Sequence, residues 1–204
     1  KVQNSNFDYD ELISSNKNII CRGPDECIHL KGETSLDFKT NNKAFYSFVF
    51  NRLSILDLTN KASQPMYSSH FNTLIMFNGE IYNHKALRSD LEEKGIIFQS
   101  NHSDTEVILN GLSFYGIDYV KQLIGQFSII FYDLKNQSIF LIRDRLGQKP
   151  LYYHHSSDKL IFSSSLKSIS QNENLREVSD KGLIDYLDYG VVPSPNTIFK
   201  EIYK

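Results

Sequence analysis

Residues 77–83 read Phe-Asn-Gly-Glu-Ile-Tyr-Asn, and this stretch marks where strand-like sequence gives way to helix-like sequence. The run Phe71–Phe77 is apolar and suits a strand, and Asn78-Gly79 is the dipeptide most typical of a tight turn between strands. Behind it, Asn83 can cap a helix that Gly95 would close, with one apolar face made of Ala86, Leu87 and Leu91. The stretch therefore predicts a chain that mixes antiparallel strands with helices.

Toward the N-terminus, strand signals alternate with turns. We expect a helix at about residues 8–18, strands at 27–30, 35–38 and 43–53, and a polar loop at 60–64. The last of these strands contains the apolar, aromatic run Ala-Phe-Tyr-Ser-Phe-Val-Phe, as in a strand that is buried on both faces.

Toward the C-terminus, a strand is expected at 96–99, followed by a helix that starts with the capping-box spacing Ser103–Glu106 and ends at Gly116. Two hairpins, a last helix and a linker are then expected at 126–132 with 138–143, 150–154 with 159–163, Ser179 to about Tyr186, and 192–195. Helices interrupt the strands without a regular βαβ alternation. The pattern favours an α+β fold with largely antiparallel sheets.

Composition narrows the classes of function. The 204 residues are 40% hydrophobic, which allows one sizeable core, and 14 Phe and 12 Tyr without Trp favour sheet packing. The net charge of −2 and the lack of a basic stripe give no electrostatic reason to expect nucleic acid, and no apolar run is long enough to span a membrane. Two cysteines, Cys21 and Cys27, are too few for a disulfide framework and lack partners for a metal site. A cytoplasmic protein without a metal fits best.

Five segments carry a more specific signal than composition. They are Arg22–Asp25 (Arg-Gly-Pro-Asp), Asn51–Asp57, Phe77–Asn83, Ser103–Val107 and Arg143–Tyr153. In this order and spacing the sequence resembles the glutaminase domain of glutamine-hydrolysing asparagine synthetases, which are class II amidotransferases with an N-terminal nucleophile (Ntn). The resemblance extends from about residue 21 to about residue 199.

The resemblance implies a four-layer αββα Ntn-hydrolase sandwich with two mainly antiparallel sheets between helices. It implies a type-2 glutamine amidotransferase domain at residues 1–175, and then a helix and linker at 176–204 that lead into an ATP-dependent synthetase domain. The pyrophosphate loop of that second domain, Ser-Gly-Gly-x-Asp-Ser, does not occur in this sequence. No cofactor is therefore expected here, and ATP and Mg²⁺ belong to the second domain.

The activity that the resemblance implies is hydrolysis of L-glutamine, which supplies ammonia for the ATP-dependent amidation of a carboxylate. The default acceptor is aspartate, which becomes asparagine, and another carboxylate stays open. The implied partners are L-glutamine and the C-terminal synthetase domain of the same polypeptide, with a homodimer left open and with no nucleic acid or membrane.

Arg52 and Asp104 are the expected ligands of the two charged ends of glutamine. The planar guanidinium of Arg52 matches a carboxylate, and the resemblance assigns it the α-carboxylate, with the backbone of Ile55 and Leu56 lining the same pocket. The alternative for Arg52 is a surface ion pair with Asp57 or another acid. The resemblance assigns the α-ammonium to Asp104, and the alternative is a first-turn carboxylate that complements the helix dipole.

Asn78 and Gly79 are the expected oxyanion hole. The Asn78 side-chain amide and the Gly79 backbone N–H would stabilise the charge that develops on the amide oxygen, an effect of about 3 kcal/mol per donor. Glu80 would bond the substrate amine or position the loop. The alternative is an ordinary Asn-Gly hairpin turn, and both interpretations place the dipeptide on a loop. The catalytic interpretation adds that this loop faces the same cavity as Arg52 and Asp104.

The nucleophile of the family is a cysteine at the mature N-terminus, whose own α-amine acts as the base. This sequence begins at Lys1 and has no cysteine before its first expected helix. Cys21 has no free amine, and Cys27 is expected to be a small buried residue on a strand. We therefore expect no glutaminase activity from this chain alone. Arg22–Asp25 and Arg143–Gly147 are expected to be structural, through turns and buried ion pairs.

Three accounts of the missing nucleophile remain open. The chain can be part of an asparagine synthetase-type enzyme whose first strand and second domain lie outside this sequence. It can be a naturally silent relative, or a non-enzymatic binding or assembly module of the same fold.

Overall fold

The computed structural model describes residues 9–35, 43–52, 63–157, 159–171 and 175–204. These residues divide into two compact units. The first contains Arg22–Lys149, and the second contains Asp10–Cys21 together with Pro150–Lys204. Parts of the expected strand 35–38 and of the expected loop 60–64 lie outside the described residues.

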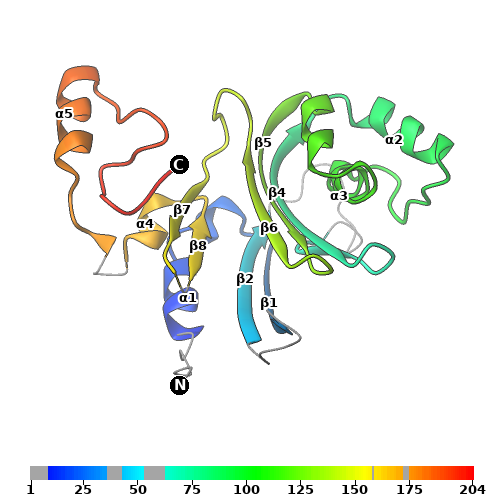
Figure 1. The fold of residues 1–204 in the computed structure, drawn as a ribbon, viewed down its shortest axis with the longest axis horizontal. Coiled ribbons are helices and arrows are strands. Elements are labelled where there is room, and N and C mark those ends of the chain that lie inside the picture. Colours follow the sequence, from blue (N-terminus) through cyan, green and yellow to red (C-terminus); the bar gives the residue numbers. More distant parts are fainter. Residues whose placement is uncertain (1–8, 36–42, 53–62, 158, 172–174) are drawn as a thin grey trace. The chain divides into compact units, whose positions relative to one another are not determined.

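The first unit contains two antiparallel sheets (Figure 1). One is the pair β1 (Glu26–Ser35) and β2 (Lys43–Arg52), and the other has the order β3 (Met66–Ser68), β4 (Thr73–Ile81), β5 (Gly125–Asp133) and β6 (Ser138–Arg143). All four strand pairs are antiparallel. The predicted α+β class and the β5–β6 hairpin are thereby confirmed.

Helices cover one face of the four-stranded sheet (Figure 1). They are α2 (His84–Glu93), α3 (Asp104–Tyr115) and the 3₁₀ segment η3 (Ile117–Gln122). Alternate side chains of β4 pack into a shared core with both α-helices, and this core includes Ile75, Phe77, Ile81, Leu87, Leu91, Val107, Ile108 and Leu112. The predicted cap is present, because Ser103 Oγ accepts a hydrogen bond from Glu106 N at 3.3 Å.

The other face of the four-stranded sheet carries Leu74 and Met76 of β4, which are buried. Tyr132 of β5 lies opposite Leu74, and its ring meets the ring of Tyr46 of β2 edge-on, with centroids 5.7 Å apart. The β1–β2 pair therefore packs on this face. Within the first unit the layers are helices, sheet and sheet.

The second unit is built around the short hairpin β7 (Tyr152–His155) and β8 (Leu160–Ser163), which confirms the last predicted pair of strands. Its helices are α1 (Tyr9–Asn16), the 3₁₀ segment η1 (Ile20–Arg22), α4 (Leu166–Ile169) and α5 (Asp180–Tyr189). Ile169, Leu175 and Ile202 form its small core. Ser179 caps α5 as predicted, by accepting from Gly182 N at 3.1 Å.

Several local predictions are wrong. Phe45 in β2 is 59% exposed, so this strand is not buried on both faces. No strand forms at 96–99, because the Glu106 carboxylate accepts the N–H groups of Gln99 (2.6 Å) and Ser100 (2.8 Å). Ala86 is exposed.

Asn83 stands at the start of α2 but caps no N–H of the helix. Its side chain instead donates to Gln122 O (2.9 Å) and accepts from Ile124 N (3.0 Å), which ties the end of β4 to the start of β5.

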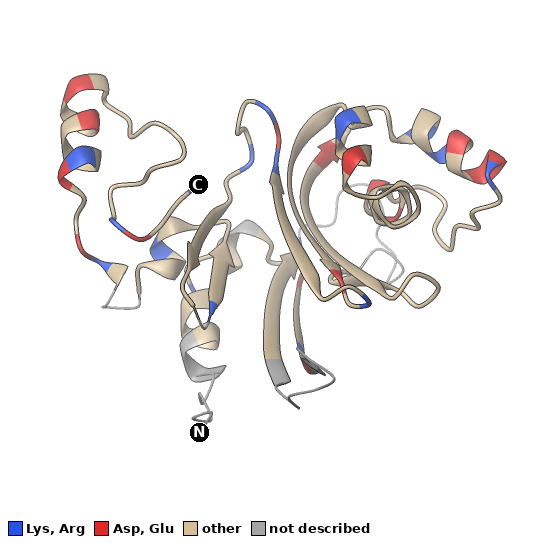
Figure 2. Cartoon of the chain, in the orientation of Figure 1, with Lys and Arg blue, Asp and Glu red and all other residues tan. Residues whose placement is uncertain are grey.

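Charged residues of both signs are interspersed along α2 and α5 (Figure 2). Among the described helices, none has the length and apolar character needed to cross a membrane.

Candidate functional site

The candidate site begins at the edge of β4 that faces away from β5. The short strand β3 covers this edge only from Thr73 to Ile75. Farther along, side chains take over as acceptors. Gln64 Oε1 accepts the Phe77 N–H at 2.6 Å, and Asp104 Oδ2 accepts the Ile81 N–H at 3.2 Å. The second half of this edge is therefore bonded to side chains that come from two different parts of the chain.

Gly79 lies midway between these two bonded positions. N–H groups two residues apart point to the same side of a strand, so the Gly79 N–H is directed to the same edge as those of Phe77 and Ile81. Only glycine fits here, because a Cβ would come within 2.1 Å of Gln126 O and the backbone φ is +156°. The Gly79 N–H is thus directed to the strand edge between the positions that the Gln64 and Asp104 side chains bind.

Asp104 is the first residue of α3, directly after the cap Ser103. Its residue exposure is only 6%. Burial raises the pKa of the Asp104 carboxyl above its ordinary value, and the N–H of Ile81, the charge of His84 and the N–H groups at the start of the helix oppose this rise. A buried carboxylate at this place favours a cation as its partner, since a positive charge would offset the cost of its desolvation.

Arg52 lies at the end of β2 and is also buried. Alternation along β2 places it on the same face as Tyr46, which is the face toward the four-stranded sheet. By the same alternation, the half-buried Asn78 shares the face of Leu74 and points toward β2. Arg52 and Asn78 therefore project into the layer between the two sheets.

Arg52 pairs with Glu26, with 3.4 Å between Nη1 and Oε2. Ser63 Oγ donates to the same Glu26 oxygen at 3.1 Å. The next residue, Gln64, donates through Nε2 to Thr105 Oγ1 at 3.4 Å. Contacts through the dipeptide Ser63-Gln64 thus connect the strand end that carries Arg52 with the first turn of α3.

Sequence reasoning missed Gln64, because residues 60–64 read as a polar loop. It is in fact 7% exposed and bonded at both ends of its amide. A glutamine in a polar stretch gives no local sign of such burial.

The structure places the expected oxyanion-hole residues differently from the prediction. The prediction that Asn78 and Gly79 sit on a loop is wrong, because both lie inside β4 and pair with Ser128 and Phe127 of β5. This also rules out the ordinary hairpin turn. Glu80 is in the strand and exposed.

Ile55, Leu56 and Asp57 lie outside the described residues. The surface position proposed as the alternative for Arg52 is wrong, because the residue is buried, although it does pair with an acid. The roles of the site residues toward glutamine stay predictions.

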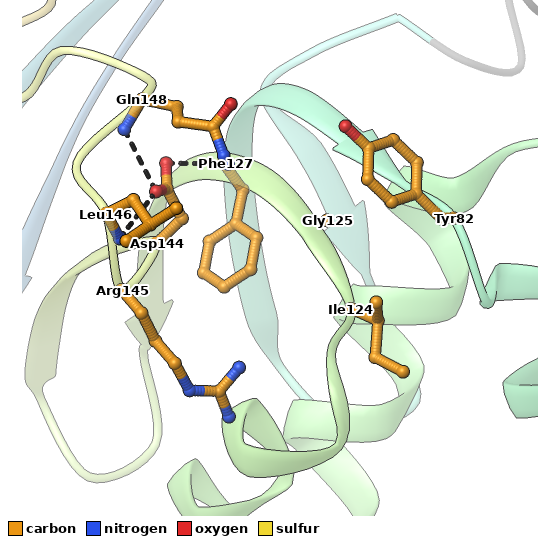
Figure 3. Close-up of a pocket in the computed structure, with 8 residues that line it drawn as sticks. All are labelled: Tyr82, Ile124, Gly125, Phe127, Asp144, Arg145, Leu146 and Gln148. Carbon is orange, nitrogen blue, oxygen red and sulfur yellow. Dashed lines mark hydrogen bonds between the residues drawn. The ribbon is translucent and has the colours of Figure 1, made fainter.

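The segment Arg143–Lys149 is a tightly bonded turn (Figure 3). The Asp144 carboxylate accepts from the N–H groups of Phe127, Leu146, Gln148 and Lys149, at 2.9–3.2 Å. Burial acts to raise the pKa of Asp144, but these four donors outweigh it and hold the pKa below its ordinary value. Arg143 donates to the carbonyls of Lys149 and Gly147. Among the described contacts of this segment, Asp144 and Arg143 bind backbone N–H and carbonyl groups and form no ion pair, so the structural role expected of it rests on backbone hydrogen bonds.

A shallow hollow of about 220 Å³ lies beside this turn, at the ends of β4 and β5 (Figure 3). Tyr82, Ile124, Arg145 and Leu146 are among the residues that line it, and none of the expected glutamine ligands within the described part of the chain does.

The earlier segment, Arg22–Asp25, also brings backbones together. Asp25 N donates to Arg52 O at 3.1 Å, and a Cβ on Gly23 would lie 2.3 Å from Asn51 O.

Both cysteines are exposed. The prediction that Cys27 is buried is therefore wrong. Its Sγ lies 3.2 Å from His29 Nε2, on the outward side of β1.

The chain as a whole belongs to a known class. The profile of the glutamine amidotransferase domain matches residues 2–204, and the chain belongs to this family, as a class II domain homologous to glutamine-hydrolysing asparagine synthetases. It is 34% identical over 198 residues to asparagine synthetase 1 (glutamine-hydrolyzing) of Bacillus subtilis (strain 168), covering 97% of this chain and 29% of that protein. It is 39% identical over 150 residues to asparagine synthetase 2 of the same organism, covering 74% and 19%.

Among solved structures, the chain resembles the glutamine phosphoribosylpyrophosphate amidotransferase of Bacillus subtilis, complexed with ADP and GMP. The TM-score is 0.51 at 19% sequence identity, over 61% of this chain and 28% of that one. At this identity the likeness supports the fold alone. The chain spans less than a third of the length of each of these proteins.

Proposed function

We propose that this chain is the glutaminase domain of a longer amidotransferase, which hydrolyses L-glutamine and supplies ammonia for the ATP-dependent amidation of a carboxylate. The observation that carries the proposal is the edge of β4. There a glycine N–H is held between two side-chain acceptors, one of them the buried carboxylate of Asp104. A neutral donor beside a buried anion suits a substrate that has both a polarised amide and an ammonium group.

In this proposal Arg52 binds the α-carboxylate of glutamine and Asp104 binds its α-ammonium. A cysteine thiolate from outside these 204 residues attacks the side-chain amide carbon. The Gly79 N–H and the Asn78 side-chain amide donate hydrogen bonds that stabilise the negative charge forming on the oxygen. The amide nitrogen takes up a proton and leaves as ammonia. Water then hydrolyses the thioester, which releases glutamate and restores the thiol.

Aspartate is the proposed acceptor, because the relatives that are 34% and 39% identical to this chain are named asparagine synthetases. An amidotransferase that acts on another carboxylate is the second candidate, since the acceptor is chosen outside this domain. ATP and Mg²⁺ belong in both cases to the synthetase part.

The test separates binding from turnover. By titration calorimetry this chain should bind L-glutamine at one site without hydrolysing it, and it should discriminate against D-glutamine. Arg52→Gln should abolish this binding, whereas Arg145→Gln, a change at an exposed arginine of the Asp144 turn, should not. The full-length gene product should release glutamate from glutamine. Absence of both binding and release would refute the function and favour a silent module.

A further inference from the structure

We propose that Gln64 is a positioning residue for glutamine hydrolysis, because its side-chain amide fixes the strand edge that presents the Gly79 N–H. The inference rests on the proposed function and adds to it a residue that touches neither the substrate nor the reacting atoms. Three observations support it, and each concerns a different part of the site.

The first observation is the way in which β3 ends. Met66 is paired with Ile75, and the same register continued by two residues would place the Gln64 backbone opposite Phe77. The Gln64 side chain is used instead, with Oε1 accepting the Phe77 N–H at 2.6 Å. A continued strand would cover the Phe77 and Gly79 N–H groups alike. The Gln64 side-chain carbonyl binds the Phe77 N–H alone, and none of the residues that the structure describes bonds the Gly79 N–H.

The second observation is the bond at the other end of the amide. Gln64 Nε2 donates to Thr105 Oγ1, next to Asp104 in the first turn of α3. Gln64 therefore binds β4 at Phe77, two residues before Gly79. It binds α3 at Thr105, one residue after the proposed ammonium ligand Asp104. Because Gln64 and Thr105 are both buried, neither partner can be replaced easily by water.

The third observation is the preceding residue. Ser63 donates to Glu26, the same carboxylate that pairs with Arg52. The dipeptide Ser63-Gln64 thus bonds to the carboxylate that pairs with Arg52, to β4 two residues before Gly79, and to the residue after Asp104 at the start of α3. Oxyanion donors act through their placement, and a shift of about 1 Å in a catalytic group can cost on the order of a hundredfold in rate.

The main variant is Gln64→Met in the full-length protein. Methionine keeps the length and approximate volume of the side chain but removes both hydrogen bonds. We expect kcat for glutamine hydrolysis to fall about ten- to a hundredfold, with KM changed less than about threefold, because the loss acts on the oxyanion donor and spares the substrate ligands. Synthesis from added ammonia should stay unchanged. Gln64→Glu, which keeps an acceptor for Phe77, should recover most of kcat.

A second measurement on this chain tests the geometry without any turnover. In Gln64→Met, hydrogen exchange should accelerate at the Phe77 amide and stay slow at Met76 and Asn78, whose N–H groups face β5. Gln122→Ala, which changes an exposed glutamine in η3, is the matched control and should alter neither readout. If Gln64→Met does not fold, Thr105→Val removes the other partner while the bond to Phe77 stays, and it should give a smaller fall in kcat with the same selectivity for glutamine over ammonia.

The outcomes separate the two proposals. Wild-type kcat in Gln64→Met, or an equal fall with glutamine and with ammonia, would overturn the role of Gln64 and leave the glutaminase function standing. No glutamine turnover in any full-length protein, wild type included, would overturn the function itself, and the exchange experiment would still report whether Gln64 holds the strand edge.

Discussion

Replacing Asp104 by Asn in the full-length protein tests the proposed site most directly. The change removes the negative charge and keeps the shape, and an Asn side-chain oxygen can still accept the Ile81 N–H that Asp104 accepts at 3.2 Å. Because the local hydrogen bond can survive, any large effect must come from the lost charge. We expect the use of glutamine to fall strongly and the use of ammonia to stay nearly unchanged.

The magnitude follows from the bond that would be lost. A hydrogen bond between a carboxylate and the substrate ammonium is worth roughly 1.5–3 kcal/mol, which corresponds to about ten- to a hundredfold in kcat/KM for glutamine. Ammonia added to the solution does not need the amino-acid pocket. Synthesis from ammonia is therefore the internal control for the acceptor half of the reaction.

The same substitution should stabilise the ligand-free fold, although it reduces the use of glutamine. Burial raises the pKa of Asp104 in the folded chain, so the folded state disfavours its charged form. A carboxyl of this kind stabilises the fold most when it is neutral, below its unfolded pKa of about 3.9, and this contribution is lost as the pH rises through the folded value. Asp104→Asn should therefore raise the melting temperature of the ligand-free chain at pH 7, and the gain should shrink as the pH is lowered to about 4.

Both effects are measured on one variant, with Asp180→Asn as the matched control. Asp180 is also the first residue of a capped helix, but it is exposed on α5. Its change should cost only about 0.3–1 kcal/mol through the helix dipole and should not alter the use of glutamine. If Asp104→Asn lowers stability as Asp180→Asn does, and reduces activity equally with glutamine and ammonia, Asp104 is a structural first-turn residue and the ligand assignment is wrong.

Three further changes test other parts of the structure. Gly79→Ala places a Cβ 2.1 Å from Gln126 O, and it should cost about 2–5 kcal/mol in urea denaturation; a neutral result would mean that β4 is not held as described. Asp144→Asn should cost about 1–3 kcal/mol at pH 7. In melts the difference should begin to shrink below about pH 4 and disappear as the pH falls through the lowered pKa of Asp144, because the ionised carboxylate stabilises the fold and the protonated one does not. Tyr119→Phe should be neutral or stabilising by up to about 1 kcal/mol in the same denaturation assay, since no described residue bonds this buried hydroxyl, whose pKa burial raises to about 12; a clear loss would reveal a partner.

Local spacing was sufficient to predict the elements whose stabilising contacts are also local. Ser103 and Glu106 are three residues apart, and the Ser103 half of the capping box forms as their spacing indicates, while the Glu106 carboxylate binds the N–H groups of Gln99 and Ser100. The hairpins β5–β6 and β7–β8 follow from apolar runs separated by short turns. In these cases the residues that stabilise an element belong to that element, and the sequence can be interpreted without knowing what lies across the fold.

Prediction failed where a distant partner decides the conformation. Asn78-Gly79 favours a turn, but pairing with β5 extends the strand through it, and the glycine serves close backbone packing. Gln64 looked like part of a polar loop, because its donor partner Phe77 and its acceptor partner Thr105 lie 13 and 41 residues away. The roles of Arg52 and Asp104 toward glutamine rest on the family resemblance, and the described contacts show their surroundings without a substrate.

The part of the β4 edge beyond β3 also bears on how copies of this chain behave toward one another. An exposed strand edge with a row of free N–H groups invites a strand of another molecule to pair with it. Here Gln64 and Asp104 occupy the groups on either side of Gly79, so a foreign strand would find at most one donor of the three. Removing both side chains together would present three donors in succession. The pair that frames the proposed chemistry would thereby also keep this edge from joining chains into dimers or larger aggregates.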